Sequence, residues 1–183
     1  QNGKKAFLGG QYICAALAGL EARGPEYVSL TNLQVLGIFD RIYGIPNLRR
    51  PQLDFLASAG VMICTQEQEG YPIEIRHQLT TCMNSVTEQE RSVVRIADLT
   101  AKYLRASCKN YIGGTNIAND IELHTKLRAT LVAAISFLVS KKILQGGTVN
   151  EIWNPDYAPD EVIANIDIEP SFPCNRIRLH LYL

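Results

Sequence analysis

The clearest periodic patterns lie in the second half of the chain. Apolar residues at steps of three and four run through residues 93–111, which predicts a long amphipathic helix. A second helix is expected to begin at Asn119 or Asp120 and to face the core with one apolar stripe: Leu123, Leu127, Leu131, Ala134, Ile135 and Leu138. Because the loop between the two helices is short, we expect them to fold back as an antiparallel pair.

Capping residues set the expected ends of this pair. Thr87 and Glu90 fit a capping box, in which each side chain accepts a free backbone N–H at the start of the first helix. Paired glycines at 113–114 and 146–147 are expected to end the two helices. Three further apolar residues predict that the C-terminal half of the second helix is buried on most sides: Val132, Phe137 and Val139.

The residues after Gly147 alternate between apolar and polar, which is the pattern of β-strands. Strands are expected over residues 148–153 and 162–169, with a proline-containing loop between them. A last alternating segment runs to the end of the chain, and its residues are Arg176, Ile177, Arg178, Leu179, His180, Leu181, Tyr182 and Leu183.

The first half of the chain is less regular. Residues 11–22 are rich in alanine and other small apolar residues, which predicts a tightly packed, buried helix that ends at residues 23–25. A short helix is expected over residues 52–58, with Pro51 in its first turn and Gly60 as its stop. Residues 61–64 and 72–83 are then expected to form a hairpin.

Together these elements predict an α+β fold in which the antiparallel helix pair packs on a mixed or antiparallel β-sheet. A length of 183 residues fits one domain, or one domain with a small second one. We place the end of an α/β core region at residues 1–82 and a second domain at residues 83–183, unless both halves form one compact domain.

The balance of charges changes the expected partners. Lys plus Arg and Asp plus Glu both number 18, so the net charge of zero gives no global field for nucleic acid or an anionic membrane. Residues 88–142 carry nine Lys or Arg against five Asp or Glu, whereas residues 143–175 carry six acids and no Lys or Arg. This segregation fits complementarity within one chain, or equally well charge matching between neighbouring copies.

The sequence gives little indication of a membrane-spanning segment or of a signal peptide. The longest apolar run, residues 131–139, is too short to span a bilayer, so no membrane insertion is expected. The chain shows no signal-peptide pattern and begins at Gln1, which indicates a part of something longer. The five cysteines form no C-x-x-C pair and are expected to be reduced, buried thiols of a cytosol-made protein.

The sequence offers little catalytic chemistry. His77, His124 and His180 have no ligand at a metal-binding spacing, and neither a phosphate loop nor a G-x-S-x-G motif is present. We therefore expect no catalytic residue, no metal and no cofactor, and an assembly component rather than an enzyme. A small α/β enzyme with widely dispersed site residues stays open as the alternative.

Nine short stretches occur in an order that resembles the C-terminal region of contractile-tail sheath proteins of phages and related injection machines. They are distributed over nearly the whole chain: 11–19 (QYICAALAG), 58–61 (SAGV), 79–81 (LTT), 90–96 (ERSVVRI), 103–105 (YLR), 111–116 (YIGGTN), 144–147 (LQGG), 166–170 (IDIEP) and 175–177 (NRI). Members of that family are longer, with an N-terminal arm and outer domains. The resemblance therefore implies either a sheath fragment or a shorter relative at the baseplate or tail terminus.

The resemblance implies a structural subunit of a contractile tail sheath. Such subunits polymerise as stacked helical rings around an inner tube and contract to drive the tube through a cell envelope, which delivers a genome or effectors. The implied partners are copies of itself, the inner tail tube protein, and baseplate and tail terminator proteins, with no direct contact to nucleic acid. The implied location is the tail of a virion assembled in the host bacterial cytoplasm.

Two sets of functional residues follow from the resemblance. The C-terminal segment, residues 176–183, is expected to add as a strand to a sheet of another copy, with an edge strand in its own sheet as the alternative. Basic residues of the first long helix are expected in part to face an acidic tube, with a solvated helix face as the alternative: Arg91, Arg95, Lys102, Arg105 and Lys109.

Overall fold

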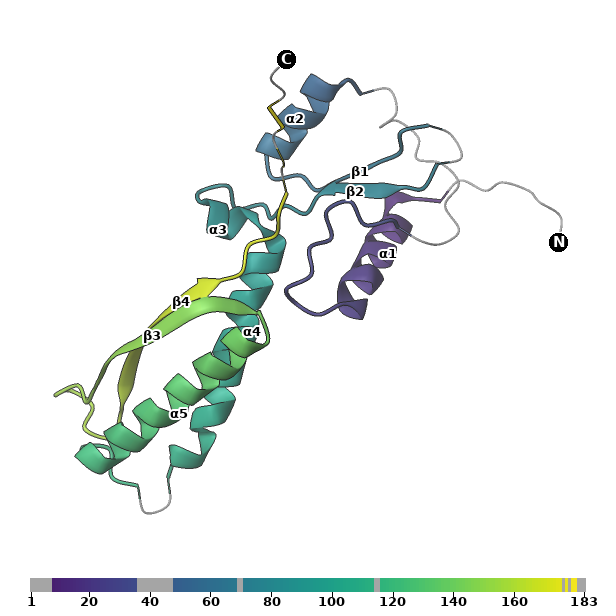
Figure 1. Ribbon diagram of the computed structural model, residues 1–183. Helices are drawn as coiled ribbons and strands as arrows, with labels where there is room; N and C mark the ends of the chain where they lie inside the picture. Colours follow the sequence, from purple (N-terminus) through teal and green to yellow (C-terminus); the bar gives the residue numbers. More distant parts are fainter. Residues whose placement is uncertain are drawn as a thin grey trace. The chain divides into compact units, whose positions relative to one another are not determined.

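The computed structural model describes residues 8–35, 48–68, 71–113, 116–175, 177 and 179–180. Within them the α+β class is confirmed, because five α-helices accompany two small antiparallel sheets of two strands each (Figure 1). The chain forms two compact units. Unit 1 comprises Gln1–Ser92 with Pro173–Leu183, and unit 2 comprises Val93–Phe172. This division differs from the boundary expected after residue 82, since Glu90 is bridged to Leu79 and accepts a hydrogen bond from Asn175, all three in unit 1.

Unit 1 is built on a short antiparallel hairpin. Its elements are α1 (Gly10–Arg23), α2 (Arg50–Ser58), β1 (Ile63–Thr65), β2 (Glu74–His77) and α3 (Val86–Gln89). β1 pairs with β2, and residues 32–35 bond to the other side of β2 through Asn32 N–H to Ile75 O and Val35 N–H to Ile73 O. The hairpin is therefore confirmed, although its strands are shorter than the expected 61–64 and 72–83. Its core consists of Leu30, Val35, Cys64, Ile73 and Ile75.

Helix α1 is present as expected and ends at Gly24, but none of its residues is buried. Ile13, Ala16, Leu17 and Leu20 pack one side of the helix against the unit 1 core. Tyr12, beside this face, is 51% exposed. The expectation of a buried helix is wrong for this chain, because the described residues cover only one face of α1.

Helix α2 ends at Ser58 as expected but begins at Arg50, two residues earlier than expected. Pro51 lies in its first turn, and Gly60 follows its C-cap with a φ of 77°. The N–H of Val61 donates to Leu56 O and the N–H of Gly60 to Ala57 O, which is the hydrogen-bond pattern of a Schellman motif. A Cβ on residue 60 would lie 2.8 Å from the carbonyl oxygen of Thr80. Glycine is thus required here both by the left-handed backbone and by the close approach of a neighbouring chain segment.

We expect Gly60→Ala to destabilise the protein more than Gly113→Ala. Both glycines have a φ of 77°, but a Cβ at Gly113 has no heavy atom within 4 Å. The left-handed backbone should cost about 1–2 kcal/mol at either position. The displaced backbone at Thr80 should add about 1–3 kcal/mol at Gly60 alone. Urea denaturation of the two variants measures this difference, and equal losses would contradict the close contact.

The start of the first long helix differs from the expected capping box. Ser85, not Thr87, is the N-cap of α3, and its hydroxyl accepts a hydrogen bond from the N–H of Glu88. The Glu90 backbone forms an isolated β-bridge with Leu79, so this residue ends α3 before α4 begins. The capping prediction fails because the serine two positions earlier offers the same hydroxyl with Glu88 at the matching spacing.

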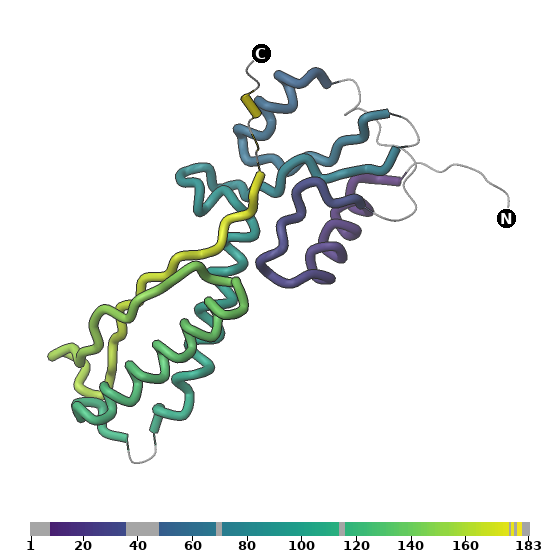
Figure 2. The backbone as a smooth tube through the Cα atoms, in the orientation of Figure 1, coloured from purple at the N-terminus to yellow at the C-terminus, as the bar shows by residue number. Residues whose placement is uncertain are grey.

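Unit 2 contains two long helices and a second hairpin. Its elements are α4 (Arg91–Cys108), whose first two residues belong to unit 1, the 3-10 turn η2 (Lys109–Tyr111), α5 (Ile121–Ser140), β3 (Leu144–Trp153) and β4 (Ile163–Pro170). α4 and α5 run in opposite directions (Figures 1 and 2), and they lie side by side because Tyr103 contacts Phe137 and Tyr111 contacts Thr130, while β3 of the hairpin packs on α5. The core consists of Ile96, Leu127, Leu131, Ile135, Leu138, Leu144 and Val149.

The predicted core stripe of α5 is confirmed, because all six of its residues are buried. Asp120 caps the helix by accepting a hydrogen bond from the N–H of Glu122. The expectation that the C-terminal half is buried on most sides is wrong, since Val132 and Phe137 are 48% and 44% exposed. Instead, the Phe137 ring stacks on Tyr103 of α4 with the ring centroids 5.5 Å apart.

Helix α5 ends six residues before the glycine pair that was expected to stop it. The N–H of Ile143 donates to Leu138 O, and Lys142 takes the left-handed conformation with a φ of 61°. These are the features of a Schellman motif with lysine in the place of glycine. Gly146 and Gly147 belong to β3. At Gly147 a Cβ would lie 3.1 Å from the Cγ2 of Ile135, so the glycine allows α5 to lie close to the strand.

The two strands of the unit 2 hairpin differ in the regularity of their backbone. β4 pairs residue by residue along its whole length, whereas β3 has two irregularities, between Leu144 and Gly146 and between Val149 and Glu151. At the second of these, the Arg128 guanidinium of α5 donates to the carbonyl oxygens of Val149 and Asn150, at 2.6 and 3.0 Å. β4 therefore has the more regular backbone for further pairing.

Among the described helices, α5 is long and apolar enough to cross a membrane by length and composition. The nine-residue run considered in the sequence is only part of it. Core helices of globular proteins have the same property, and the buried stripe of α5 packs against α4 and the hairpin. This packing accounts for the six buried residues of the helix, whereas Val132 and Phe137 remain about half exposed.

Candidate functional site

The C-terminal segment leaves the last strand with its apolar side chains exposed. Three of its positions are described, and none of them belongs to a strand. Ile177 is 77% exposed and Leu179 is 82% exposed. His180 is also exposed. Arg176, Arg178, Leu181, Tyr182 and Leu183 lie outside the described residues. The two described apolar side chains of this segment are thus exposed and pack little against the described residues.

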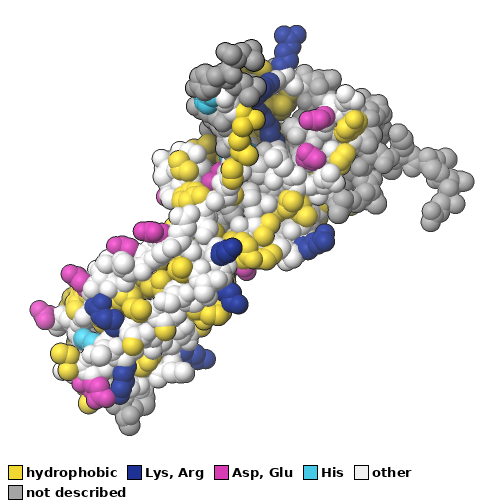
Figure 3. All heavy atoms as spheres, viewed as in Figure 1, with side chains coloured by type: hydrophobic (Ala, Val, Ile, Leu, Met, Phe, Trp, Pro, Cys, Tyr) yellow, Lys and Arg dark blue, Asp and Glu magenta, His cyan; other side chains and the backbone are white. Residues whose placement is uncertain are grey.

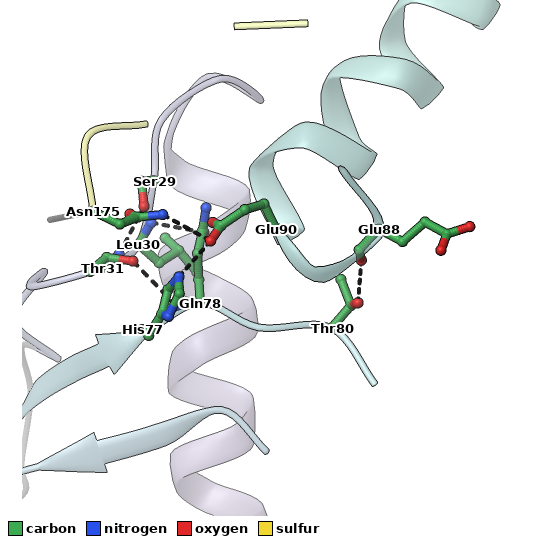
Figure 4. A network of polar contacts seen from close by, with 9 residues as sticks. All are labelled: Ser29, Leu30, Thr31, His77, Gln78, Thr80, Glu88, Glu90 and Asn175. Carbon is green, nitrogen blue, oxygen red and sulfur yellow. Dashed lines mark hydrogen bonds and ion pairs between the residues drawn. The ribbon is translucent and has the colours of Figure 1, made fainter. Parts of the chain in front are cut away.

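A buried carboxylate holds the start of this segment (Figure 4). Glu90 is 5% exposed, and its Oε1 accepts a hydrogen bond from the Asn175 side-chain amide at 2.8 Å. The same oxygen lies 2.5 Å from Nε2 of His77 on β2. We call these three residues the Glu90 clamp. The sequence analysis did not bring them together, because it assigned Glu90 to a helix cap and the amide comes from 85 residues further along the chain.

Residues of β2 and the segment directly after it hold Glu90 in place. The bridge between Leu79 and Glu90 places the side chain beside the end of β2. Next to it, the buried Gln78 accepts a hydrogen bond from the N–H of Leu30 at 2.8 Å and donates its own N–H to the Thr31 hydroxyl (Figure 4). Glu90 Oε2 and Gln78 Nε2 are buried without a hydrogen-bond partner among the described residues. The carboxylate is therefore held through one oxygen.

An open groove of about 430 Å³ runs beside the Glu90 clamp within unit 1. Its walls are both apolar and polar: Thr31, Asp54, Ala57, Val61, Ile63, Arg76, His77, Leu79 and Asn175. Arg76 forms an ion pair with Asp54 of α2 across this wall. Because His77 and Asn175 line the groove, the position of the C-terminal segment and the shape of the groove depend on each other.

The basic residues predicted to face a tube follow one face of α4 and η2, since they recur at steps of three, four and seven. Arg91, in unit 1, bonds to Glu21 of α1 with 2.9 Å between Nε and Oε1, so its charge is used within the chain. Arg95 is half-buried. The remaining three are exposed, and we call them the α4 basic stripe: Lys102, Arg105 and Lys109.

Acidic residues occupy the outer face of the unit 2 hairpin. On β4, Asn165, Asp167 and Glu169 are exposed, whereas Ala164, Ile166 and Ile168 face the helices as the alternation predicts. In Figure 3, acidic side chains gather along the margin of unit 2 over this hairpin. The carboxylate of Asp167 accepts a hydrogen bond from the Asn150 amide at 2.7 Å. The outer face of β4 thus carries negative charge at alternate positions.

The described residues contain no group of three or more His, Cys, Asp or Glu that would hold a metal ion. The five cysteines are free, but the expectation that all are buried is wrong, because Cys14 and Cys174 are exposed. Burial raises the pKa of the Cys64 and Cys108 thiols, which keeps both protonated and weakly nucleophilic. Cys82 and Cys108 are half-buried.

The comparisons with known proteins identify the fold. No family model and no curated protein match the chain. Among solved structures, a chain of the anti-feeding prophage baseplate has a TM-score of 0.73 at 11% identity, with 93% of this chain and 49% of that one covered. A sheath tail protein from Listeria innocua has a TM-score of 0.70 at 18% identity, with 90% and 40% covered.

A sheath tail protein from Desulfitobacterium hafniense has a TM-score of 0.64 at 15% identity, with 91% of this chain and 42% of that one covered. The chain thus spans half or less of the length of each of these three structures. Nine-tenths or more of it takes part in each alignment. The resemblance expected from the sequence is confirmed at the level of structure: the chain has the fold of contractile tail sheath proteins.

Proposed function

We propose that this chain is a structural subunit of a contractile tail sheath, with a mechanical rather than a catalytic role. The observation that carries the proposal is the sheath-protein fold over nine-tenths of the chain, at TM-scores of 0.70 and 0.64. The two sheath structures are described as tail proteins, so the proposed location is the tail of a phage or a related particle. The proposed partners are further copies, an inner tube, and baseplate and terminator proteins.

The C-terminal segment is the proposed link between copies. Its eight residues match the eight residues of β4, whose register is regular. The edge of β3 is a poorer acceptor, because its two irregularities and the Arg128 contacts disturb the ladder. We therefore propose that residues 176–183 of one copy add as a strand to the free edge of β4 in another.

Charge supports this choice of edge. The polar side chains of the segment begin with Arg176 and Arg178, two residues apart. The outer face of β4 carries Asp167 and Glu169 at the same spacing. Opposite charges on neighbouring strands stabilise their pairing and fix its register. The proposed strand addition thus places the basic end of one copy against the acidic hairpin of the next.

Contraction would draw its energy from these interfaces. A folded unit that packs in two ways releases the difference in interface free energy when it passes from one packing to the other. The strands between copies keep the subunits connected during that change. No nucleotide is needed for such a step, and the sequence contains no phosphate-loop motif.

The α4 basic stripe is the proposed contact to an acidic inner tube. We expect the double variant K102E/R105E to co-sediment less with tubes at low salt, because exposed charges attract over roughly 10 Å at 0.1 M ionic strength. The loss should shrink as salt is added. The control variant K126E/K141E also reverses two positive charges, at an exposed position of α5 and at its exposed C-cap. It should co-sediment as the unmodified protein does. Equal behaviour of the two variants would place the tube contact elsewhere.

Electron microscopy of the purified chain tests the proposed function. Long tubes with a helical repeat are expected of a sheath subunit. The baseplate neighbour, solved as a six-fold assembly, favours a second candidate, a baseplate component. That candidate predicts single closed rings that do not stack. A dispersed chain at high protein concentration that turns over a compound in a substrate panel would instead support the enzyme alternative.

A further inference from the structure

We propose that Glu90 is the positioning residue of the C-terminal segment: by holding Asn175, it fixes the point at which the segment begins. The inference deepens the proposed function, because it assigns the exchanged segment a fixed origin, but the contact itself lies within one chain. Only residues 176–183 are then free to reach another copy.

The geometry of the contact favours a holding role. Glu90 is buried at 5% exposure, whereas Asn175 is an exposed residue whose amide reaches inward to the carboxylate at 2.8 Å. A buried polar oxygen that has lost its water is stabilised by the hydrogen bonds that it accepts from the protein. The second carboxylate oxygen is buried without a partner among the described residues, so the bonds at Oε1 are the ones that compensate for burial.

The support behind Glu90 is rigid enough to define a position. Its backbone is bridged to Leu79, and Oε1 lies 2.5 Å from the His77 ring nitrogen on β2. Asn175 in turn stands directly before the alternating segment. Beyond it, Ile177 and Leu179 are exposed at 77% and 82%. Asn175 is therefore hydrogen-bonded to the protein (Figure 4), whereas the described residues after it are exposed.

Reach and register depend on this position. An extended chain spans about 3.3 Å per residue, so eight free residues reach about 26 Å. If the hold were lost, Asn175 itself would join the free segment and lengthen it. A shift by one residue exchanges the two faces of an added strand. A fixed origin thus favours one register on the neighbouring copy.

Limited trypsin digestion of the dispersed chain tests the inference, because Arg176 and Arg178 are trypsin sites beside Asn175. The protease must bind several extended residues on each side of the cut, which the hold at Asn175 hinders. N175D places a second carboxylate against Glu90. We expect the initial rate of cleavage after Arg176, followed by intact mass, to rise about tenfold. N110D makes the same change at an exposed asparagine of η2 and should leave the rate unchanged.

The double variant E90Q/N175D exchanges the amide and the carboxylate: the new amide donates one hydrogen to the carboxylate at position 175 and the other to Nε2 of His77, in the imidazole tautomer that accepts there. We expect its cleavage rate to return to within about twofold of the unmodified chain. N175D cleaved at the unmodified rate would overturn the inference. So would a folded double variant, checked by circular dichroism, that is cut as fast as N175D. Since no polymer is needed, either result is independent of whether the chain forms tubes.

Discussion

Removal of residues 176–183 is expected to abolish polymerisation and to leave the chain folded. The described positions of this segment, 177, 179 and 180, belong to neither sheet and contribute exposed side chains, so little of the core is lost with them. The truncation keeps Asn175 and therefore the Glu90 clamp. We expect a thermal midpoint within a few degrees of the unmodified chain and no tubes by electron microscopy.

A charge exchange separates strand addition from a general need for the C-terminus. R176E/R178E should lose assembly, because the segment would meet Asp167 and Glu169 with like charge. Adding D167R/E169R to the same chain restores opposite charges at every contact between copies and should restore tubes. Unfolding of the truncated chain would show that the segment belongs to its own core. Normal tubes from the truncated chain would show that the link lies elsewhere.

Leu131→Ala is expected to lower the free energy of unfolding by about 2–5 kcal/mol. Leu131 is 2% exposed and lies in the unit 2 core with Ile96 and Val149. Truncation to alanine removes most of the side chain from a site enclosed by α4, α5 and β3, where the neighbours cannot close the cavity fully. Urea denaturation followed by far-UV circular dichroism gives the change directly.

Val132→Ala is the matched control, because Val132 is the next residue of α5 and is 48% exposed. Its loss should stay within about 0.5–1 kcal/mol, as at other surface positions. Equal losses at the two positions would mean that the buried face of α5 has been assigned to the wrong side. Because α5 contributes six buried residues, such a result would overturn the packing of unit 2.

The core of unit 2 was predictable because it rests on periodicity. The stripe on α5 and the alternation on β4 follow from residue spacing alone, and the structure buries these faces. The ends of the helices were less predictable. Lysine at position 142 takes a conformation that glycine favours, and Ser85 competes with Thr87 for the same cap. In both places local chemistry allows two solutions, and packing decides between them.

Candidate functional residues were visible in the sequence only where they lie close together along the chain. The basic spacing on α4 and the alternation of residues 176–183 are visible in the sequence. The Glu90 clamp is not, because it joins β2, the end of α3 and a residue 85 positions later. Likewise, the ion pair of Arg91 with Glu21, 70 residues away, cannot be read from the local spacing of basic residues. Contacts at such separations depend on the fold and not on local pattern.

The bond between Glu90 and Asn175 also closes a loop in the covalent chain. Unit 2, Val93–Phe172, lies between these two residues, with two residues on each side as connections. A domain whose two ends start from neighbouring points is an insertion that its host tolerates, because the host's backbone path is the same with or without it. Unit 2 is therefore an insertion in the sequence of unit 1, and it begins and ends close to two residues of that unit that are hydrogen-bonded to each other.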